Sequence, residues 1–145
     1  MLVVAVAGVL ALVAYPSFMD SIRKGRRAEA VAALAQVQQA QERWRSNKTS
    51  YADNAKLTVD PPNGLGLKAS TSSGLYTLSI DLDPDKPDSI YTATATAVAG
   101  KSQSNDTHCT VMRLRLKNAN FEYGGCAGCA MPEGALTDPD RCWSR

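Results

Sequence analysis

The first nineteen residues of the chain, MLVVAVAGVLALVAYPSFM, form an apolar run without a charged side chain. At about 1.5 Å per residue, a helix of this length spans roughly 28 Å, close to the thickness of the hydrocarbon layer of a bilayer. A soluble monomer does not leave so large an apolar surface exposed. We therefore expect residues 1–24 to be the half of the helix that is buried in lipid or against other apolar helices. A basic cluster, Arg23, Lys24, Arg26 and Arg27, follows the apolar run.

Gly8 and Pro16 interrupt the helix propensity of this run. Glycine weakens a helix by about 1 kcal/mol, and proline removes a backbone hydrogen bond. We therefore expect the segment between them to be the part of the helix that unwinds most easily.

Beyond the apolar run the helical period continues, with a stripe of apolar residues at three- and four-residue spacing. The stripe consists of Ala30, Ala33, Val37, Ala40 and Trp44, widened by Val31 and Leu34. One helix is therefore expected from near the start to about Asn47, apolar all round at first and amphipathic over residues 25–47.

The remaining residues are sufficient for one small α+β domain. Residues 48–74 carry the Gly, Pro, Asn and Ser residues of a connecting loop, with one short helical turn at Asp53 to Leu57. Residues 75–117 show the alternation of strands, at 76–82, at Ile90 to Val98 and at 109–117, with a possible short fourth strand at Phe121 to Tyr123. We expect an antiparallel sheet of three or four strands packed on the helix stripe, followed by a C-terminal loop over residues 118–145.

Four cysteines lie between Cys109 and Cys142, which favours an oxidising compartment and two disulfides. The spacing Cys126-x-x-Cys129 is also found in redox dithiols, but those open a helix after a strand, and this pair lies in a glycine-rich loop. A zinc site that adds Cys109 and Cys142 is the other alternative, although only one closely spaced ligand pair is present. Four cysteines allow three pairings, which the spacing alone leaves open.

Arg113, Arg115 and Lys117 alternate along the third expected strand and would form a basic row on one sheet face, with Lys101 near it. Such alternation usually marks the solvated side of a strand. The functional alternative is a stripe that contacts DNA phosphates, although the net charge of the whole chain is only +2.

No motif of an enzyme, a bound cofactor or a metal site is recognisable in this sequence. The single histidine, His108, is expected at a strand edge without a catalytic partner. Asn47-Lys48-Thr49 and Asn105-Asp106-Thr107 match the short glycosylation acceptor pattern.

The apolar run with Gly8 and Pro16, followed by SIRKGRRAEA, resembles the N-terminal helix of type IV pilins. Further segments are similar to the PilE-like group of minor pilins: AQERW at 40–44, SYA at 50–52, LYTLSI at 75–80, YTATA at 91–95, Cys109 and the terminal Cys142-Trp143. The resemblance implies the pilin fold, and it implies that Cys109 pairs with Cys142 and Cys126 with Cys129. Mature family members begin with a phenylalanine and a glutamate upstream of this start, so the N-terminus looks truncated and no residue here takes the glutamate's role.

The resemblance further implies a structural subunit stored in the bacterial inner membrane and assembled with copies of itself into an extracellular filament. The apolar helices would form the filament core, and Gly8 and Pro16 would let the helix stretch during assembly. Other minor pilins and the inner-membrane assembly machinery are the expected partners, and N-terminal methylation, adhesion, twitching motility and DNA uptake are the expected associations. The alternatives are a DNA-receptor pilin and a type II secretion pseudopilin.

Overall fold

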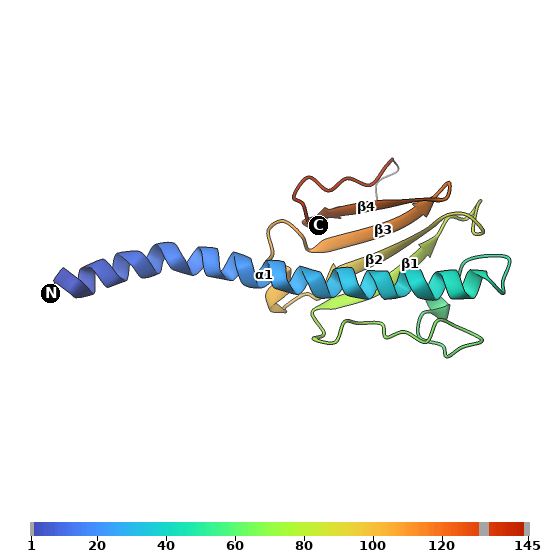
Figure 1. The fold of residues 1–145 in the computed structure, drawn as a ribbon, viewed down its shortest axis with the longest axis horizontal. Helices are drawn as coiled ribbons and strands as arrows, with labels where there is room; N and C mark the ends of the chain where they lie inside the picture. Colours follow the sequence, from blue (N-terminus) through green and yellow to red (C-terminus); the bar gives the residue numbers. More distant parts are fainter. Residues whose placement is uncertain (1, 131–133, 144–145) are drawn as a thin grey trace.

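A computed structural model describes the backbone of residues 2–130 and 134–143 and the side chains of residues 18–130 and 134–143. A single long helix, α1, runs in front of a twisted sheet and extends well beyond it at its N-terminal end (Figure 1). The elements in order are α1 (Leu2–Arg45), the short 3-10 turn η1 (Asn54–Lys56), β1 (Tyr76–Leu82), β2 (Tyr91–Ala97), a second turn η2 (Ser102–Asn105), β3 (Val111–Lys117) and β4 (Asn120–Cys126). The α+β fold expected from the sequence is confirmed.

The sheet is antiparallel throughout, with the strands in the order β1-β2-β3-β4. The fourth strand is longer than the predicted Phe121 to Tyr123 and takes in residues that were expected to begin the C-terminal loop. The third strand begins at Val111, so His108 and Cys109 precede it rather than lying in it or at its edge. The expected helical turn in the connecting loop is present as η1.

The core lies between α1 and the face of the sheet that we call the inner face. The predicted stripe is buried there: Ala30, Leu34 and Val37 are fully covered, and Ala33 and Ala40 nearly so. They pack opposite Ala93 and Ala95 of β2, whose small side chains let the helix approach the sheet closely. Burial of this apolar area is the main source of stability for the domain.

The side chains of residues 1–17, which include Gly8 and Pro16, lie outside the described part of the chain. The helical backbone of α1 continues through both positions. Among the residues that are described, no helix is both long and apolar enough to cross a membrane.

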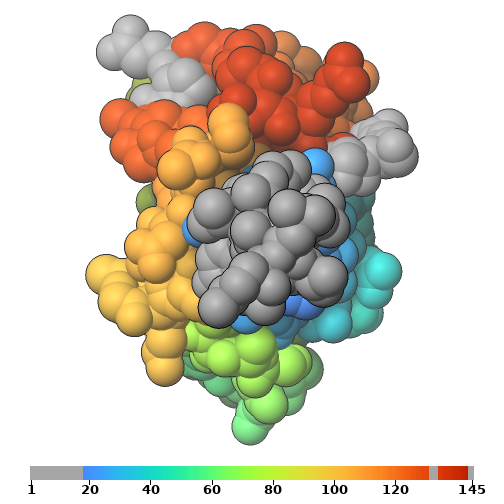
Figure 2. Space-filling model, turned by 90° about the vertical axis from the view of Figure 1, so that its left-hand side faces the viewer, coloured from blue at the N-terminus to red at the C-terminus, as the bar shows by residue number. Residues whose placement is uncertain are grey.

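A buried ion pair fastens the loop between β2 and β3 to α1, and the view along the helix shows this loop beside it (Figure 2). Asp106 Oδ2 lies 2.7 Å from Arg27 Nε, and Asp106 Oδ1 lies 2.8 Å from Arg27 Nη2. At the other end, the buried Gln41 donates to Ala52 O and accepts from Ala52 N. These contacts fix the helix relative to the loops at both ends of the sheet.

Candidate functional site

The predicted basic row lies on the outer face of the sheet, the face turned away from α1, but two of its three members are not accessible. Arg113 is 8% exposed and Arg115 is 6% exposed, whereas Lys117 at the end of β3 is half-buried. The interpretation of the row as a solvated face is therefore wrong for Arg113 and Arg115, and contact of the row with DNA stays a prediction. Alternation placed these residues on one face correctly but could not show what covers that face.

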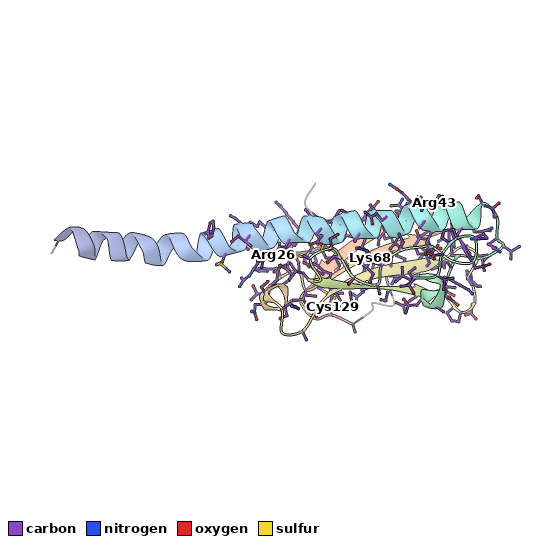
Figure 3. The ribbon with its side chains drawn as sticks, turned by 90° about the horizontal axis from the view of Figure 1, so that it is seen from below. Arg26, Arg43, Lys68 and Cys129 are labelled. Atoms are coloured by element: carbon purple, nitrogen blue, oxygen red, sulfur yellow. A yellow bond between two sulfur atoms is a disulfide. The ribbon has the colours of Figure 1, made fainter. Side chains whose placement is uncertain are left out.

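The cover is the C-terminal segment, by which we mean residues 127–130 and 134–143. Cys129 lies on the side of the sheet opposite to α1 (Figure 3). Its carbonyl oxygen accepts a 2.7 Å hydrogen bond from Arg113 Nη2, and Gly134 O accepts one of the same length from Arg115 Nη1. Arg115 Nη1 also lies 3.7 Å from Glu122 Oε2 across the strand pair. The two guanidinium groups thus hold the C-terminal segment against the sheet.

Two adjacent glycines of β4 allow this close approach. A Cβ at Gly125 would overlap Cys142 Cβ, and one at Gly124 would lie 2.9 Å from Leu136 Cβ. Trp143 Nε1 donates a 2.8 Å hydrogen bond to Gly124 O, and its ring contacts Tyr123 edge-on at 4.9 Å between centroids. The Gly-Gly pair in the sequence was a signal for such an approach.

The disulfides join Cys109 to Cys142 and Cys126 to Cys129, which is the pairing that the resemblance implied. All four cysteines are therefore oxidised, and neither a zinc thiolate site nor a free dithiol is formed. No cluster of three or more potential metal ligands occurs in the described part of the chain. The exposed His108 lies 3.2 Å from Asp140 Oδ1 in the C-terminal segment.

An accessible basic site lies elsewhere, at the C-terminal end of α1. We call it the distal groove: Arg43, Trp44, Asn47 and Lys48 form one wall, and Pro61, Pro62, Gly64 and Leu65 of the connecting loop form the other. Its volume is about 470 Å³, and none of these lining residues is acidic. The Lys48 ammonium stands 5.3 Å from the centre of the Trp44 ring, and Arg43 points away from the sheet (Figure 3).

The groove exists because the helix end and the loop are tied together. Trp44 Nε1 donates to Ser50 O, which turns the chain back, and Leu65 N donates to Lys56 O, which closes the loop opposite. Cations at a helix C-terminus also interact favourably with the helix dipole, so Arg43 stabilises α1 as well. The sequence pattern did not predict this site, although the basic and aromatic run RWRSNK contained its helix wall.

A basic, aromatic and acid-free groove suits an anionic ligand with flat rings or sugars, and nucleic acid has this chemistry. A family model described as "Type IV minor pilin ComP, DNA uptake sequence receptor" matches residues 16–113. The match covers the sheet-packing half of α1, β1, β2 and the first part of β3, and leaves out β4 and the C-terminal segment. No curated protein matches the chain.

Proposed function

Because the chain belongs to the family of ComP-type minor type IV pilins, DNA uptake sequence receptors, we propose that it captures duplex DNA as a minor subunit of a pilus. The family match over most of the described head carries this proposal, together with the pilin arrangement of one long helix on an antiparallel sheet. The expected alternative of a DNA-receptor pilin thereby becomes the leading hypothesis. The pseudopilin alternative has no comparable support.

For the location, we propose that residues 1–24 anchor the chain in the inner membrane before assembly and lie in the core of the extracellular filament afterwards. The charge-free run is compatible with the bilayer and with the filament core, because both environments shield its apolar side chains from water. The partners would be copies of this chain, other pilins and the inner-membrane assembly machinery. Labelling of purified filaments with an antibody against the head would test this, and filaments without label would count against it.

For the DNA contact, we propose the distal groove rather than the β3 row. Arg43 and Lys48 are exposed on its rim, whereas the guanidinium groups of Arg113 and Arg115 bind the C-terminal segment. Of the row, only Lys117 retains enough exposure to reach a phosphate. Exposed cations give affinity through the release of counterions from the duplex, and this affinity depends strongly on salt.

The test compares two double variants of the full chain in detergent by fluorescence anisotropy with a labelled duplex. Arg43→Glu/Lys48→Glu should weaken binding at least tenfold and lower the slope of log affinity against log salt by about two, one unit for each phosphate contact. Lys68→Glu/Lys101→Glu changes the charge equally at two exposed lysines outside the groove and should have little effect. Equal losses in both variants would show that the groove has no special role.

Receptor function also requires sequence preference, which phosphate contacts alone do not supply. Selection from a random duplex library should enrich a short motif with the wild-type chain. If no motif is enriched, the chain binds DNA without sequence preference, and the receptor proposal is contradicted.

A further inference from the structure

The two disulfides of the head lie in different surroundings. Cys109 and Cys142 are both buried, and their bond joins residues 33 apart in sequence. Cys126 is half-buried and Cys129 is exposed, and their bond joins residues 3 apart. A bond that closes a short loop removes less entropy from the unfolded chain than one that closes a long loop, and exposed disulfides are the ones that thiols reach. The Cys126–Cys129 bond is therefore the more easily reduced of the two.

A guanidinium group contacts the exposed half of this bond. Arg113 Nη1 lies 3.1 Å from Cys129 Sγ, and Arg113 Nη2 donates a 2.7 Å hydrogen bond to Cys129 O. Arg115 adds to the positive potential around Arg113, whereas Asp81 reduces it. A cation beside a cysteine stabilises the thiolate relative to the thiol, so Arg113 favours the reduced form of Cys129.

The backbone around the bond is held by contacts that do not depend on it. Cys126 is the last residue of β4 and pairs with Val111 of β3. Gly128 N donates a 2.8 Å hydrogen bond to Thr110 Oγ1, and Gly128 has a φ of 66° or less, at 65°, which glycine adopts without strain. The two sulfurs therefore stay near each other when the bond is open, so that its cleavage is reversible.

We propose that Cys126 and Cys129 form a thiol–disulfide exchange site that accepts electrons from the dithiol of a partner oxidoreductase. The partner's first thiolate bonds to the exposed Cys129 Sγ, the bond to Cys126 breaks, and Cys126 takes up a proton. The partner's second thiolate then attacks the partner's own sulfur and forms the partner's disulfide, and Cys129 leaves as a thiolate beside Arg113. Two electrons and one proton pass to the chain, and the partner's other proton goes to water.

Exchange at this site changes the surface of the head without unfolding it, because the buried bond between Cys109 and Cys142 stays closed. The proposal does not depend on DNA capture, since the exchange site and the distal groove share no residue.

The first experiment equilibrates the full chain in detergent with mixtures of reduced and oxidised dithiothreitol, alkylates the free thiols and assigns them by peptide mass spectrometry. We expect Cys126 and Cys129 to be reduced at a ratio of reduced to oxidised reagent at least tenfold lower than Cys109 and Cys142, with an unchanged circular dichroism spectrum. A tenfold difference corresponds to about 30 mV. Reduction of both bonds together, or only in the unfolded chain, would overturn the proposal.

Arg113→Gln tests the role of the guanidinium. It should raise the ratio needed to reduce Cys126 and Cys129 at least threefold, because the Cys129 thiolate loses its cation. Arg115→Lys is the matched control on the same strand, since it keeps the charge and alters a contact with Gly134 O rather than with sulfur. Its ratio should equal that of the wild type, and equal shifts in the two variants would refute the role of Arg113.

A measurement on the wild type does not require either variant to fold. With Cys126 and Cys129 reduced and the buried bond intact, ultraviolet absorbance should show a thiolate that forms below about pH 8.5, the ordinary value for a cysteine. Ionisation of both thiols at or above this pH would contradict the proposal.

A thioredoxin variant without its second, resolving cysteine tests the order of attack. Its single thiol stops the exchange at the first step, so a mixed disulfide with Cys129 should accumulate and be identified by mass spectrometry. A mixed disulfide with Cys126 instead, or with neither cysteine, would overturn the proposal.

Discussion

The ion pair between Arg27 and Asp106 should contribute more to the stability of the head than any exposed pair. Asp106 accepts two hydrogen bonds from Arg27, one from Gln103 Nε2 at 2.8 Å, and two from the backbone N–H groups of His108 and Cys109. The side chains of Arg27 and Asp106 are 7% and 1% exposed. Removal of one partner of a buried pair costs about 3–5 kcal/mol, because the other charge stays buried and unpaired.

We predict this loss for Arg27→Met, measured by urea unfolding of the full chain in detergent and followed by tryptophan fluorescence. At about 4 °C per kcal/mol for a domain of this size, the unfolding temperature should fall by about 12–20 °C. Lys24→Met is the matched control on the same helix, since Lys24 and Asp20 form an exposed, solvent-screened pair whose loss should change the stability very little.

The double variant Arg27→Met/Asp106→Asn should lose less than the sum of the single losses, with a coupling energy of about 1–3 kcal/mol. If Arg27→Met costs no more than Lys24→Met, or if the two losses add, the pair is not energetically coupled and the reasoning is refuted.

Acid should reveal the same pair. Burial by itself would raise the pKa of Asp106, but the hydrogen bonds and charge of Arg27 and the N–H donors together outweigh it and lower this pKa. A carboxylate with a lowered pKa in the folded state contributes stability above its unfolded pKa of 3.8, and this contribution is lost as pH falls below that value. The wild type should therefore lose stability below about pH 4 more steeply than Asp106→Asn does.

Three further outcomes are expected. Gly125→Ala should cost about 1–3 kcal/mol in urea unfolding, because its Cβ would overlap Cys142, whereas Gly134→Ala, with nothing within 4 Å, should cost little. Replacement of Cys109 and Cys142 by serine should cost about 3–4 kcal/mol in the same assay, since their bond joins residues 33 apart in sequence. Tyr91→Phe should leave stability at pH 7 unchanged or slightly raised, because the buried hydroxyl has no partner among the described residues. Burial raises the pKa of Tyr91, so the wild type should lose stability as pH rises above 10, and Tyr91→Phe should lose less in a pH series of the same measurement.

The parts of the fold that the sequence predicted well are those in which one periodic face meets one partner. The stripe from Ala30 to Ala40 and the alternation of β1 to β3 each identify an inner face, and burial against each other is the only way to remove both from water. Disulfide pairing was available only through the resemblance, because the spacing permits three arrangements.

The candidate sites were harder to predict, because they depend on loops that pack over regular elements. The period of β3 places Arg113 and Arg115 on the outer face but contains no information about the segment that covers them. Asp106 illustrates the same difficulty. Its sequence context matches a glycosylation acceptor, whereas in the fold its carboxylate is buried and accepts several hydrogen bonds. The two walls of the distal groove come from the end of α1 and from the connecting loop. A local sequence pattern does not show that these two segments lie side by side.

The continuity of α1 links the proposed anchor to the proposed DNA contact. The helix is unbroken from Leu2 to Arg45, so Arg43 lies 24 residues, or about 36 Å, beyond the end of the apolar run at Met19. Because this distance is measured outward from the end of the apolar run, an anchor that is fully inserted in the bilayer leaves the groove in water. The same holds when residues 1–19 are packed among other helices, because the groove is at the opposite end of the rod. DNA binding at the groove should therefore be the same before and after assembly, and charge changes there should alter DNA capture without altering assembly.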